Sequence, residues 1–475
     1  MLNHPVFENF RRISLIPRCS KKEEAIRAYL VGWADAKGFA HKSDATGNLV
    51  VYVPANVAKA YMPTIILQSH MDMVCEKTPE CEHNFDTDPL DLYVDGDWLM
   101  ARGTSLGADN GIGMAYAMTA AEGDSPHPPL ELLFTTDEET GLSGALGLDA
   151  GLLQGAIMFN MDSEDEDTLI IGCASGRSRE ITANFVTAPV AEGALVFKLS
   201  LNNLLGGHSG IEIHKQNANA NKLIFGFLNK ICCGSGLQLL RYHGGSAMNA
   251  IPRDGKALFA VKEGYESEMR LLLKEYAAEI QQAYPQEKIE FKLRKLTADY
   301  AALSVDDTVK VLDLVTLLPH GVLRVEPKLP AQTETSCNLG PVSFEDGRFS
   351  ALLFIRSSND YQGYLVAKQC SVLAKRLDFT VTVRETDTGA WQPKWDAPLL
   401  AHCKELYTEV MGREPKIEVI HAGLECGVII GKYPNIDALS FGPEQFGAHS
   451  PGERLNMPSA LRVWNFLQAI LKSYA

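Results

Sequence analysis

Four short apolar runs near the start of the chain constrain its fold more than any other feature. LVVYV at 49–53 is rich in β-branched residues, and TIILQSH (64–70), PLELLFTT (129–136) and AIMFNMD (156–162) follow it. The last three are largely apolar rather than alternating, which is typical of strands covered on both faces. Helix-like segments such as 111–122 separate the runs. The pattern predicts an α/β domain with a mixed, largely parallel sheet flanked by helices.

The pattern changes near residue 185. Strand-like runs such as 194–201 occur there among long amphipathic segments such as 267–284, which predicts a separate α+β domain. Two domains also suit the length, because 475 residues exceed what one hydrophobic core usually supports. The expected division is a discontinuous first domain at 1–185 and 389–475, with a second domain inserted at 186–388.

Composition and charge argue against several classes of partner. The chain has 44 Lys and Arg residues against 59 Asp and Glu residues, so its formal charge is −15. With no basic block, this disfavours nucleic acid and anionic membranes as partners. The first residues lack the pattern of a signal peptide, and no apolar run reaches the ~18 residues of a membrane span. The ten scattered cysteines predict reduced thiols and a cytoplasmic location.

Metal-compatible side chains stand where the predicted strands end, which is where open α/β sheets bind ligands. His70 and Asp72 lie two positions apart in SHMD, so both side chains can face one site. His70 could bind a metal while Asp72 accepts its other ring N–H. Asp162 ends the run at 156–162. A capped structural histidine and a solvated acidic turn are the alternatives for these two stretches.

Three further stretches add ligand types. TTDEETG crowds Asp137, Glu138 and Glu139 after a buried run, where cations would offset their repulsion and a surface turn is the alternative. Asp109, in LGADNGIG, could offer one oxygen to each of two cations, or simply cap a helix. His449 lies in a Gly/Pro-rich loop before the last helix-like segment. Together the residues predict a site for two divalent ions such as Zn²⁺, Mn²⁺ or Co²⁺.

Taken in order, SHMD, LGADNG, TDEETG, the strand-ending Asp and GAHSPGE resemble the co-catalytic zinc exopeptidases, which include carboxypeptidase G, peptidase T and carnosinase. The resemblance spans essentially the whole chain. IPRCSKKE and HAGLECG also look like the bacterial Xaa-His dipeptidase subgroup. The resemblance to the family implies a zinc-exopeptidase-like catalytic domain. It also implies that 186–388 is a lid that mediates formation of a homodimer.

The resemblance implies which residues hold the metal ions. His70 and Asp162 would bind one ion, Glu139 and His449 would bind the other, and Asp109 would bridge the two.

It also implies catalytic roles. Asp72 would orient His70, and Glu138 would be the general base that takes a proton from water and passes it to the leaving amine. His208, in LLGGHSG, would help to hold the tetrahedral oxyanion, often in the partner subunit's site.

Three residues are candidates for substrate binding. Arg356 could clamp a C-terminal carboxylate with a bidentate fork. Asn249 could bind the same group or the scissile carbonyl, and Glu425 could receive the substrate's ammonium group. A surface ion pair, a turn asparagine and a helix-entry carboxylate are the respective structural alternatives.

These observations favour a cytoplasmic metallo-dipeptidase. It would hydrolyse unblocked dipeptides of the Xaa-His type, with broad specificity, through metal-activated water. Two zinc ions per subunit are expected, with cobalt or manganese as alternatives. An N-acyl amino acid deacylase on the same scaffold is the alternative activity, and a non-catalytic binding module is a third hypothesis.

Overall fold

A computed structural model describes residues 2–59, 61–297, 300–384 and 387–475, which form two compact units. Unit 1 comprises Met1–Cys173, Trp391–Val419 and Leu424–Ala475, and unit 2 comprises Ala174–Ala390 and Ile420–Gly423. The chain passes from unit 1 to unit 2 after Cys173, earlier than the boundary expected after residue 185. The reason is that β9 (Ser175–Asn184) pairs along its whole length with β18 (Arg348–Ser357) in the sheet of unit 2.

The main sheet of unit 1 has the order β1-β2-β6-β3-β7-β21-β8-β20. Its strands are β1 (Ala40–Ser43), β2 (Leu49–Val53), β3 (Ile65–His70), β6 (Leu130–Thr135), β7 (Ile157–Asn160), β8 (Thr168–Cys173), β20 (Lys416–Ile420) and β21 (Asp437–Ser440). At its centre, β3 is parallel to both β6 and β7, and β21 is parallel to β7. Antiparallel pairing of β1, β2 and β6 completes one edge. The predicted α/β fold with a mixed sheet is confirmed.

The apolar runs fail to alternate because both faces of this sheet are covered. Leu67 and Phe134 belong to the main core, while their neighbours Ile66 and Leu133 point to the opposite face and are also fully buried. Strands buried on both faces need apolar residues at every position.

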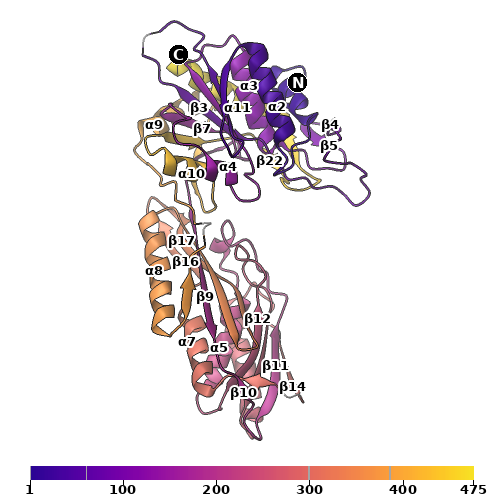
Figure 1. The fold of residues 1–475 in the computed structure, drawn as a ribbon, viewed down its shortest axis with the longest axis vertical. Helices are drawn as coiled ribbons and strands as arrows, with labels where there is room; N and C mark the ends of the chain where they lie inside the picture. Colours follow the sequence, from indigo (N-terminus) through magenta and orange to yellow (C-terminus); the bar gives the residue numbers. More distant parts are fainter. Residues whose placement is uncertain (1, 60, 298–299, 385–386) are drawn as a thin grey trace. The chain divides into compact units, whose positions relative to one another are not determined.

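Helices cover this sheet, and Figure 1 shows α2, α3 and α11 gathered near β3 and β7. In α3 every residue from Gly111 to Ala120 is buried. Gly38 ends α2 in the left-handed conformation (φ 73°), as its position predicts. The helices of unit 1 are α1 (Pro5–Ser14), α2 (Glu24–Lys37), α3 (Ala108–Glu122), α4 (Ser143–Gly147), α9 (Pro398–Met411), α10 (Glu425–Lys432) and α11 (Met457–Tyr474). A small second sheet contains β4 (Leu92–Asp95), β5 (Trp98–Ala101), β22 (Gln445–Phe446) and β23 (Arg454–Asn456).

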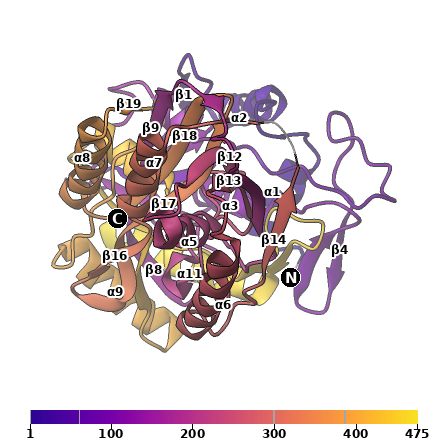
Figure 2. The ribbon, with the colours of Figure 1, turned by 90° about the horizontal axis from the view of Figure 1, so that it is seen from below.

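Unit 2 is an antiparallel sheet with helices packed along one face, as Figures 1 and 2 show for α5, α7 and α8. The strand order is β14-β11-β13-β12-β17-β18-β9-β19, with β16 paired to β17. The remaining strands are β10 (Ala188–Pro189), β11 (Leu195–Leu201), β12 (Gln238–Gly244), β13 (Gly255–Val261), β14 (Phe291–Leu296), β15 (Ala301–Ala302), β16 (Gly321–Glu326), β17 (Leu329–Glu345) and β19 (Thr380–Thr382). The helices are η1 (Ile213–Lys215), α5 (Ala220–Cys232), α6 (Glu266–Ala283), α7 (Val305–Leu317) and α8 (Asp360–Arg376). Side chains of α5, α7 and α8 share one apolar core with the strands.

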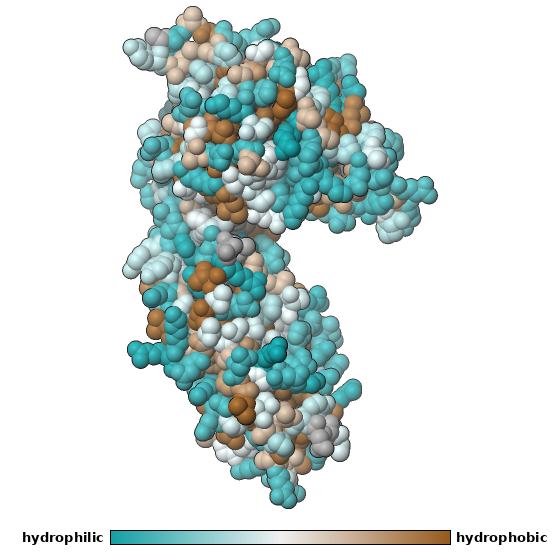
Figure 3. All heavy atoms as spheres, in the orientation of Figure 1, coloured by the Kyte–Doolittle hydropathy of each residue, from teal (hydrophilic) through white to brown (hydrophobic). Residues whose placement is uncertain are grey.

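On the face drawn in Figure 3, hydrophobic side chains occur in small groups among hydrophilic ones. Each helix within the described ranges is too short or too polar to cross a bilayer.

One prediction about the cysteines is wrong, because Cys19 and Cys75 form a disulfide. Their Cα atoms lie 5.6 Å apart although 56 positions separate them in the sequence. The chain brings them together through an isolated parallel bridge between Cys19 and Met73, in which Met73 N donates to Arg18 O. Scattered cysteines give no indication of such a tertiary approach, so sequence spacing alone could not identify the pair.

Loss of this disulfide should lower the free energy of unfolding by about 4 kcal/mol, because the closed loop restricts the unfolded chain. We expect Cys19→Ser to show this loss in urea unfolding, with Cys81→Ser, which removes a free thiol from the same unit, as the matched control. Thiol titration of the unfolded, unreduced wild type should find eight free cysteines. A titration that finds all ten would show that the disulfide does not form.

Candidate metal centre

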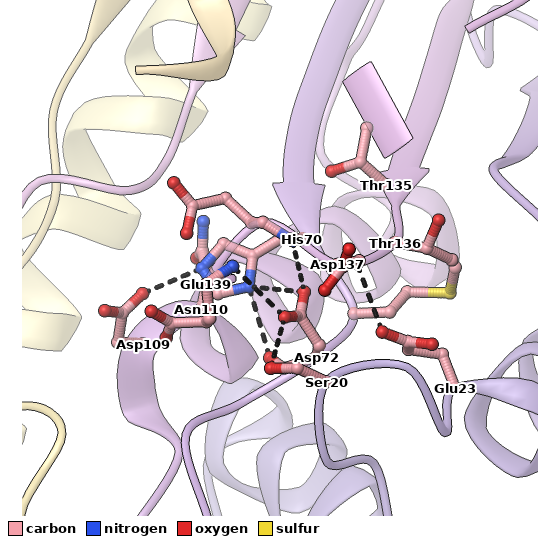
Figure 4. Close-up of polar contacts among 12 residues, drawn as sticks. Ser20, Glu23, His70, Asp72, Asp109, Asn110, Thr135, Thr136, Asp137 and Glu139 are labelled. Carbon is pink, nitrogen blue, oxygen red and sulfur yellow. Dashed lines mark hydrogen bonds and ion pairs between the residues drawn. The ribbon is translucent and has the colours of Figure 1, made fainter. Parts of the chain in front are cut away.

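The register of three parallel strands brings the predicted metal-binding stretches together. His70, the last residue of β3, is level with Thr135, the last residue of β6. On the other side of β3, Gln68 is level with Asn160, the last residue of β7. The polar residues that follow these strands therefore leave the sheet at one edge, as expected for parallel strands. Figure 4 shows His70, Asp72, Asp109 and Glu139 converging there.

Asp109 lies between two imidazole rings. Its Oδ1 is 2.9 Å from Nε2 of His70, and its Oδ2 is 3.3 Å from Nε2 of His449. A second carboxylate contacts the same nitrogen of each ring: Asp162 Oδ1 is 3.3 Å from His70 Nε2, and Glu139 Oε2 is 2.9 Å from His449 Nε2. The five residues thus form two groups that share Asp109, which is the arrangement expected of a bridging carboxylate.

These side chains fit a pair of divalent cations. Glu139 Oε1 and Asp162 Oδ1 are buried and have no hydrogen-bond partner among the described residues. Ligand atoms of His70, Asp109 and Glu139 all lie within 4.8 Å of one another. Two ligand atoms of a tetrahedral zinc ion, each about 2.0–2.1 Å from the metal, are about 3.3 Å apart. The observed nitrogen–oxygen separations are close to that value.

Positive charge on both histidines balances the carboxylates in the metal-free protein. Burial lowers the pKa of His70, but Asp162, Asp109 and Asp72 together raise it well above its usual value. The contacts with Asp109 and Glu139 raise the pKa of His449 to about 11. Metal binding requires neutral imidazoles, so it must displace these protons.

Asp72 holds several parts of the site at once. Nδ1 of His70 contacts it, 3.1 Å from the backbone oxygen and 3.4 Å from Oδ1. Its carboxylate also accepts hydrogen bonds from Ser20 Oγ (2.8 Å) and from the backbone N–H groups of Glu138 (3.0 Å) and Glu139 (3.2 Å). Burial opposes ionisation, yet His70 lowers the pKa of Asp72 to about 2. Asp72 therefore contacts both the ring of His70 and the turn that carries both glutamates.

The three adjacent acidic residues have different environments. Asp137 adopts a left-handed conformation (φ 49°), and its carboxylate accepts hydrogen bonds from the hydroxyl groups of Thr140 and Ser143. Glu139 points to His449. Burial, reinforced by the charges of neighbouring carboxylates, raises the pKa of Glu138 well above its usual value although His70 opposes the shift. In the metal-free protein, the carboxyl group of Glu138 therefore favours its protonated form.

Glu425, the first residue of α10, is completely buried in unit 1. Its Oε2 accepts hydrogen bonds from Gln68 Nε2 and Thr135 Oγ1, both at 2.6 Å, while Oε1 has no partner among the described residues. Burial raises the pKa of Glu425 to about 8. One oxygen of this buried carboxyl group is thus left without a polar partner among the described residues.

Unit 2 contains a separate cluster of polar residues around the buried cation of Arg356. Arg356 is buried, its guanidinium lies 4.5 Å from the centre of the Phe354 ring, and its Nε has no partner among the described residues. A Cβ on Gly210 would lie 3.2 Å from Arg356 Cζ, 2.9 Å from His208 Cε1 and 2.7 Å from the backbone oxygen of His421, so these residues are neighbours. A buried cation without a carboxylate partner can bind an anion.

The protonation of both histidines in this cluster follows from their surroundings. Nδ1 of His208 accepts hydrogen bonds from the backbone N–H groups of Gly210 (3.3 Å) and Ile211 (3.2 Å), so the ring proton is on Nε2. Burial and the charge of Arg356 lower the pKa of His208, and they lower the pKa of His421 to about 3. His208 is thus a neutral donor through Nε2.

Sequence reasoning missed some of the residues around these clusters. His421 stands in HAGLECG, where only Glu425 was singled out, and its Nε2 lies 2.7 Å from Ser336 Oγ. The position of His421 in the same stretch as Glu425 could have identified it as a candidate. Asn249 is exposed in unit 2, and its backbone oxygen accepts from Ser209 N.

The chain is similar to known proteins along nearly its whole length. A model of peptidase family M20/M25/M40 matches residues 66–473. The chain is 36% identical over 471 residues to the cytosol non-specific dipeptidase of Escherichia coli (strain K12), covering 98% of this chain and 97% of that protein. It is similar to the crystal structure of aminoacylhistidine dipeptidase from Vibrio alginolyticus, with a TM-score of 0.93, 34% identity and coverage of 99% and 96%. A tripeptidase from Staphylococcus aureus shares the fold, with a TM-score of 0.56, 16% identity and coverage of 99% and 98%.

Asp162→Asn should change stability in opposite directions without and with metal. Burial raises the pKa of Asp162 from 3.8 to about 6, so the stability its proton confers is present below pH 4 and lost as pH rises through 6. In metal-free protein at pH 7, the neutral asparagine should remove a cost of roughly 3 kcal/mol and raise Tm.

With saturating zinc, the same variant should melt below the wild type, because a ligand has been lost. The check is calorimetry with and without zinc at pH 4 and pH 7. Equal responses of both proteins to zinc would remove Asp162 from the ligand set.

Proposed function

The chain belongs to peptidase family M20/M25/M40, and we propose that it is a metal-dependent dipeptidase of the Xaa-His type with broad specificity. Hydrolysis of peptide bonds follows from the family and from its dipeptidase relatives. The observation that carries the proposal is the placement of Asp109 between His70 and His449, with Glu138 beside them.

We propose that His70 and Asp162 hold one divalent ion, that Glu139 and His449 hold the other, and that Asp109 bridges them. Zinc is the expected metal, with cobalt or manganese as alternatives, because imidazole and carboxylate ligands suit all three. Two such ions would activate a water molecule and polarise the peptide carbonyl.

Glu138 would act as the general base. Its carboxylate would take a proton from the attacking water and deliver it to the nitrogen of the leaving amino acid, so that the C–N bond breaks as the amine forms. The position of Glu138 close to His70 and Asp109 supports this role, because a base must lie near the water that it deprotonates. Asp72 would keep His70 oriented and hold the backbone of Glu138 in place.

His208 and Arg356 of unit 2 would contact the substrate. Nε2–H of His208 is a neutral donor suited to the negative charge that develops on the carbonyl oxygen. Arg356 would pair with the C-terminal carboxylate, since its buried guanidinium forms no ion pair with a carboxylate of the described residues. Asn249 is proposed as a further polar contact for that carboxylate or for the scissile carbonyl.

Glu425 would bind the ammonium group at the other end of the substrate. Its unpartnered Oε1 supports this assignment. Glu425 would thus select substrates that carry a free ammonium group. An N-acyl amino acid has no ammonium group, so this feature favours a dipeptidase over the alternative deacylase.

We also propose a cytoplasmic homodimer that assembles through unit 2. The cytosolic relative supports the location. The proposed substrate is a peptide. The net charge of −15 disfavours nucleic acid as a partner.

Glu138→Gln should abolish hydrolysis while leaving the metal in place. The amide cannot take a proton, so kcat for Ala-His should fall by at least about a thousandfold, toward the upper end of a general base's contribution. Metal content, measured by atomic absorption, should stay at the wild-type value. Glu139→Gln is the paired control and should lose metal. Full activity in Glu138→Gln would exclude Glu138 as the base.

Free and blocked substrates distinguish the two activities. We expect turnover of Ala-His and little turnover of N-acetyl-histidine, because only the dipeptide carries an ammonium group. Glu425→Gln keeps an acceptor for Gln68 and Thr135 but cannot ionise to pair with the ammonium group, so it should raise KM for Ala-His by roughly tenfold or more. Preferred hydrolysis of N-acetyl-histidine by the wild type would support the deacylase instead.

A further inference from the structure

A buried arginine lies beside the metal centre of unit 1 and has no role in the mechanism above. Arg18 is 1% exposed. Its Nη1 donates to the backbone oxygens of Met71 (3.1 Å) and Asp72 (2.8 Å), and its Nη2 donates to the backbone oxygen of Gly107. One guanidinium therefore joins the segment that follows His70 to the turn that precedes Asp109.

Two glycines make room for this guanidinium. A Cβ on Gly107 would lie 2.5 Å from Arg18 Nη2, and a Cβ on Gly111 would lie 2.7 Å from the same atom. Gly107 also has a left-handed backbone (φ 65°), which other residues adopt only with strain. The chain thus forms a fitted space for the arginine side chain.

A buried carboxylate binds the other side of the same turn. Glu453 is 2% exposed, and it accepts hydrogen bonds from four consecutive backbone N–H groups. Its Oε2 binds those of Leu106 (2.7 Å) and Gly107 (2.8 Å), and its Oε1 binds those of Ala108 (2.7 Å) and Asp109 (3.3 Å). Because Glu453 follows His449 by four positions, it ties the loop of His449 to the turn of Asp109.

The buried guanidinium of Arg18 lies among several carboxylates. Arg18 interacts with Glu453 and then with Asp72, Asp109 and Glu139. A guanidinium holds several carbonyl oxygens in a rigid fork, whereas the ammonium of a lysine is a flexible point charge. The rigid geometry of the Arg18 guanidinium therefore holds the two backbone segments at a fixed distance from each other.

We propose that Arg18 and Glu453 are positioning residues of the metal centre. Arg18 sets Asp109 against His70, and Glu453 sets Asp109 against His449. Neither residue touches the metal ions or the substrate; they act through the backbone of the turn at 106–109. The inference rests on the proposed function for its metal ligands, and it adds the residues that hold those ligands at their spacing.

The test uses Arg18→Lys and Glu453→Gln in the full chain, reloaded with cobalt. Each should weaken binding of at least one cobalt ion by about tenfold or more, as loss of an outer contact to a metal ligand typically does. The visible spectrum of bound cobalt should change, since it reports ligand geometry. For Ala-His, kcat should fall by about tenfold or more while KM changes little.

Glu131→Gln is the matched control. Glu131 is a buried carboxylate of the same unit that accepts backbone N–H groups of Gln154 and Gly155, near the amino end of β6. Its substitution should lower Tm and leave cobalt affinity and spectrum at wild-type values. If Arg18→Lys and Glu453→Gln behave like this control, the proposal is overturned.

Gly111→Ala serves where the charge variants fail to fold. Its methyl group would press on Arg18 Nη2 without removing any charge, and Gly32→Ala in α2, where a Cβ meets open space, is the control. We expect the cobalt spectrum to change in Gly111→Ala alone, and an unchanged spectrum overturns the proposal. Cobalt binding is read independently of turnover. A wild type that binds two cobalt ions but cleaves no dipeptide would refute the proposed function and leave the positioning role standing.

Discussion

The metal centre depends on one fully buried carboxylate, that of Asp72. It joins the end of β3 to the turn after β6, and Ser20 Oγ adds the N-terminal segment. Without it, two backbone N–H groups and a hydroxyl would lose their acceptor inside the protein, at a cost of about 1–3 kcal/mol for each group left unsatisfied. Its contacts therefore extend from the ring of His70 to the backbone of Glu138 and Glu139.

Buried negative charge dominates the region around Asp72. Asp109, Glu138, Asp162 and Glu425 lie close enough to perturb one another's ionisation. Desolvated carboxylates cannot all be ionised without compensating cations. In the metal-free protein, protons on the histidines and carboxylates supply that compensation, and metal ions would replace the protons. Protonation and metal binding are therefore alternative ways to stabilise the same fold.

Local sequence was sufficient to predict the parts of this site that lie within one element. The continuous apolar character of 64–70 and 129–136 identified buried strands. The polar residues after them were expected at the ligand-binding edge because open α/β sheets bind ligands at the carboxyl ends of their strands. For Asp109 the stretch alone left a helix cap as the alternative, and the bridging role came from the resemblance to the zinc exopeptidases. The carboxylate contacts both His70 and His449, and its role as a bridge stays a prediction.

Predictions failed where the outcome depends on segments far apart in the chain. The Cys19–Cys75 disulfide requires the bridge between Cys19 and Met73, which no spacing rule reveals. Arg18 and Glu453 were inside quoted stretches, yet nothing local distinguishes a buried arginine from a surface one. The division into units depends on the pairing of β9 with β18, a partner more than 150 positions away, which local sequence does not reveal.

The order of strands in unit 1 has a consequence for how the protein is made. β21 (Asp437–Ser440) lies between β7 and β8, so the middle of this sheet is the part that leaves the ribosome late. At about 5–20 residues per second, the stretch from residue 174 to residue 436 takes roughly 13–50 s to synthesise. During that interval β7 has an unpaired edge, which is an aggregation hazard. Unit 2, almost all of which is encoded in between, can fold first, whereas the catalytic centre is assembled only when the final stretch of the nascent chain arrives.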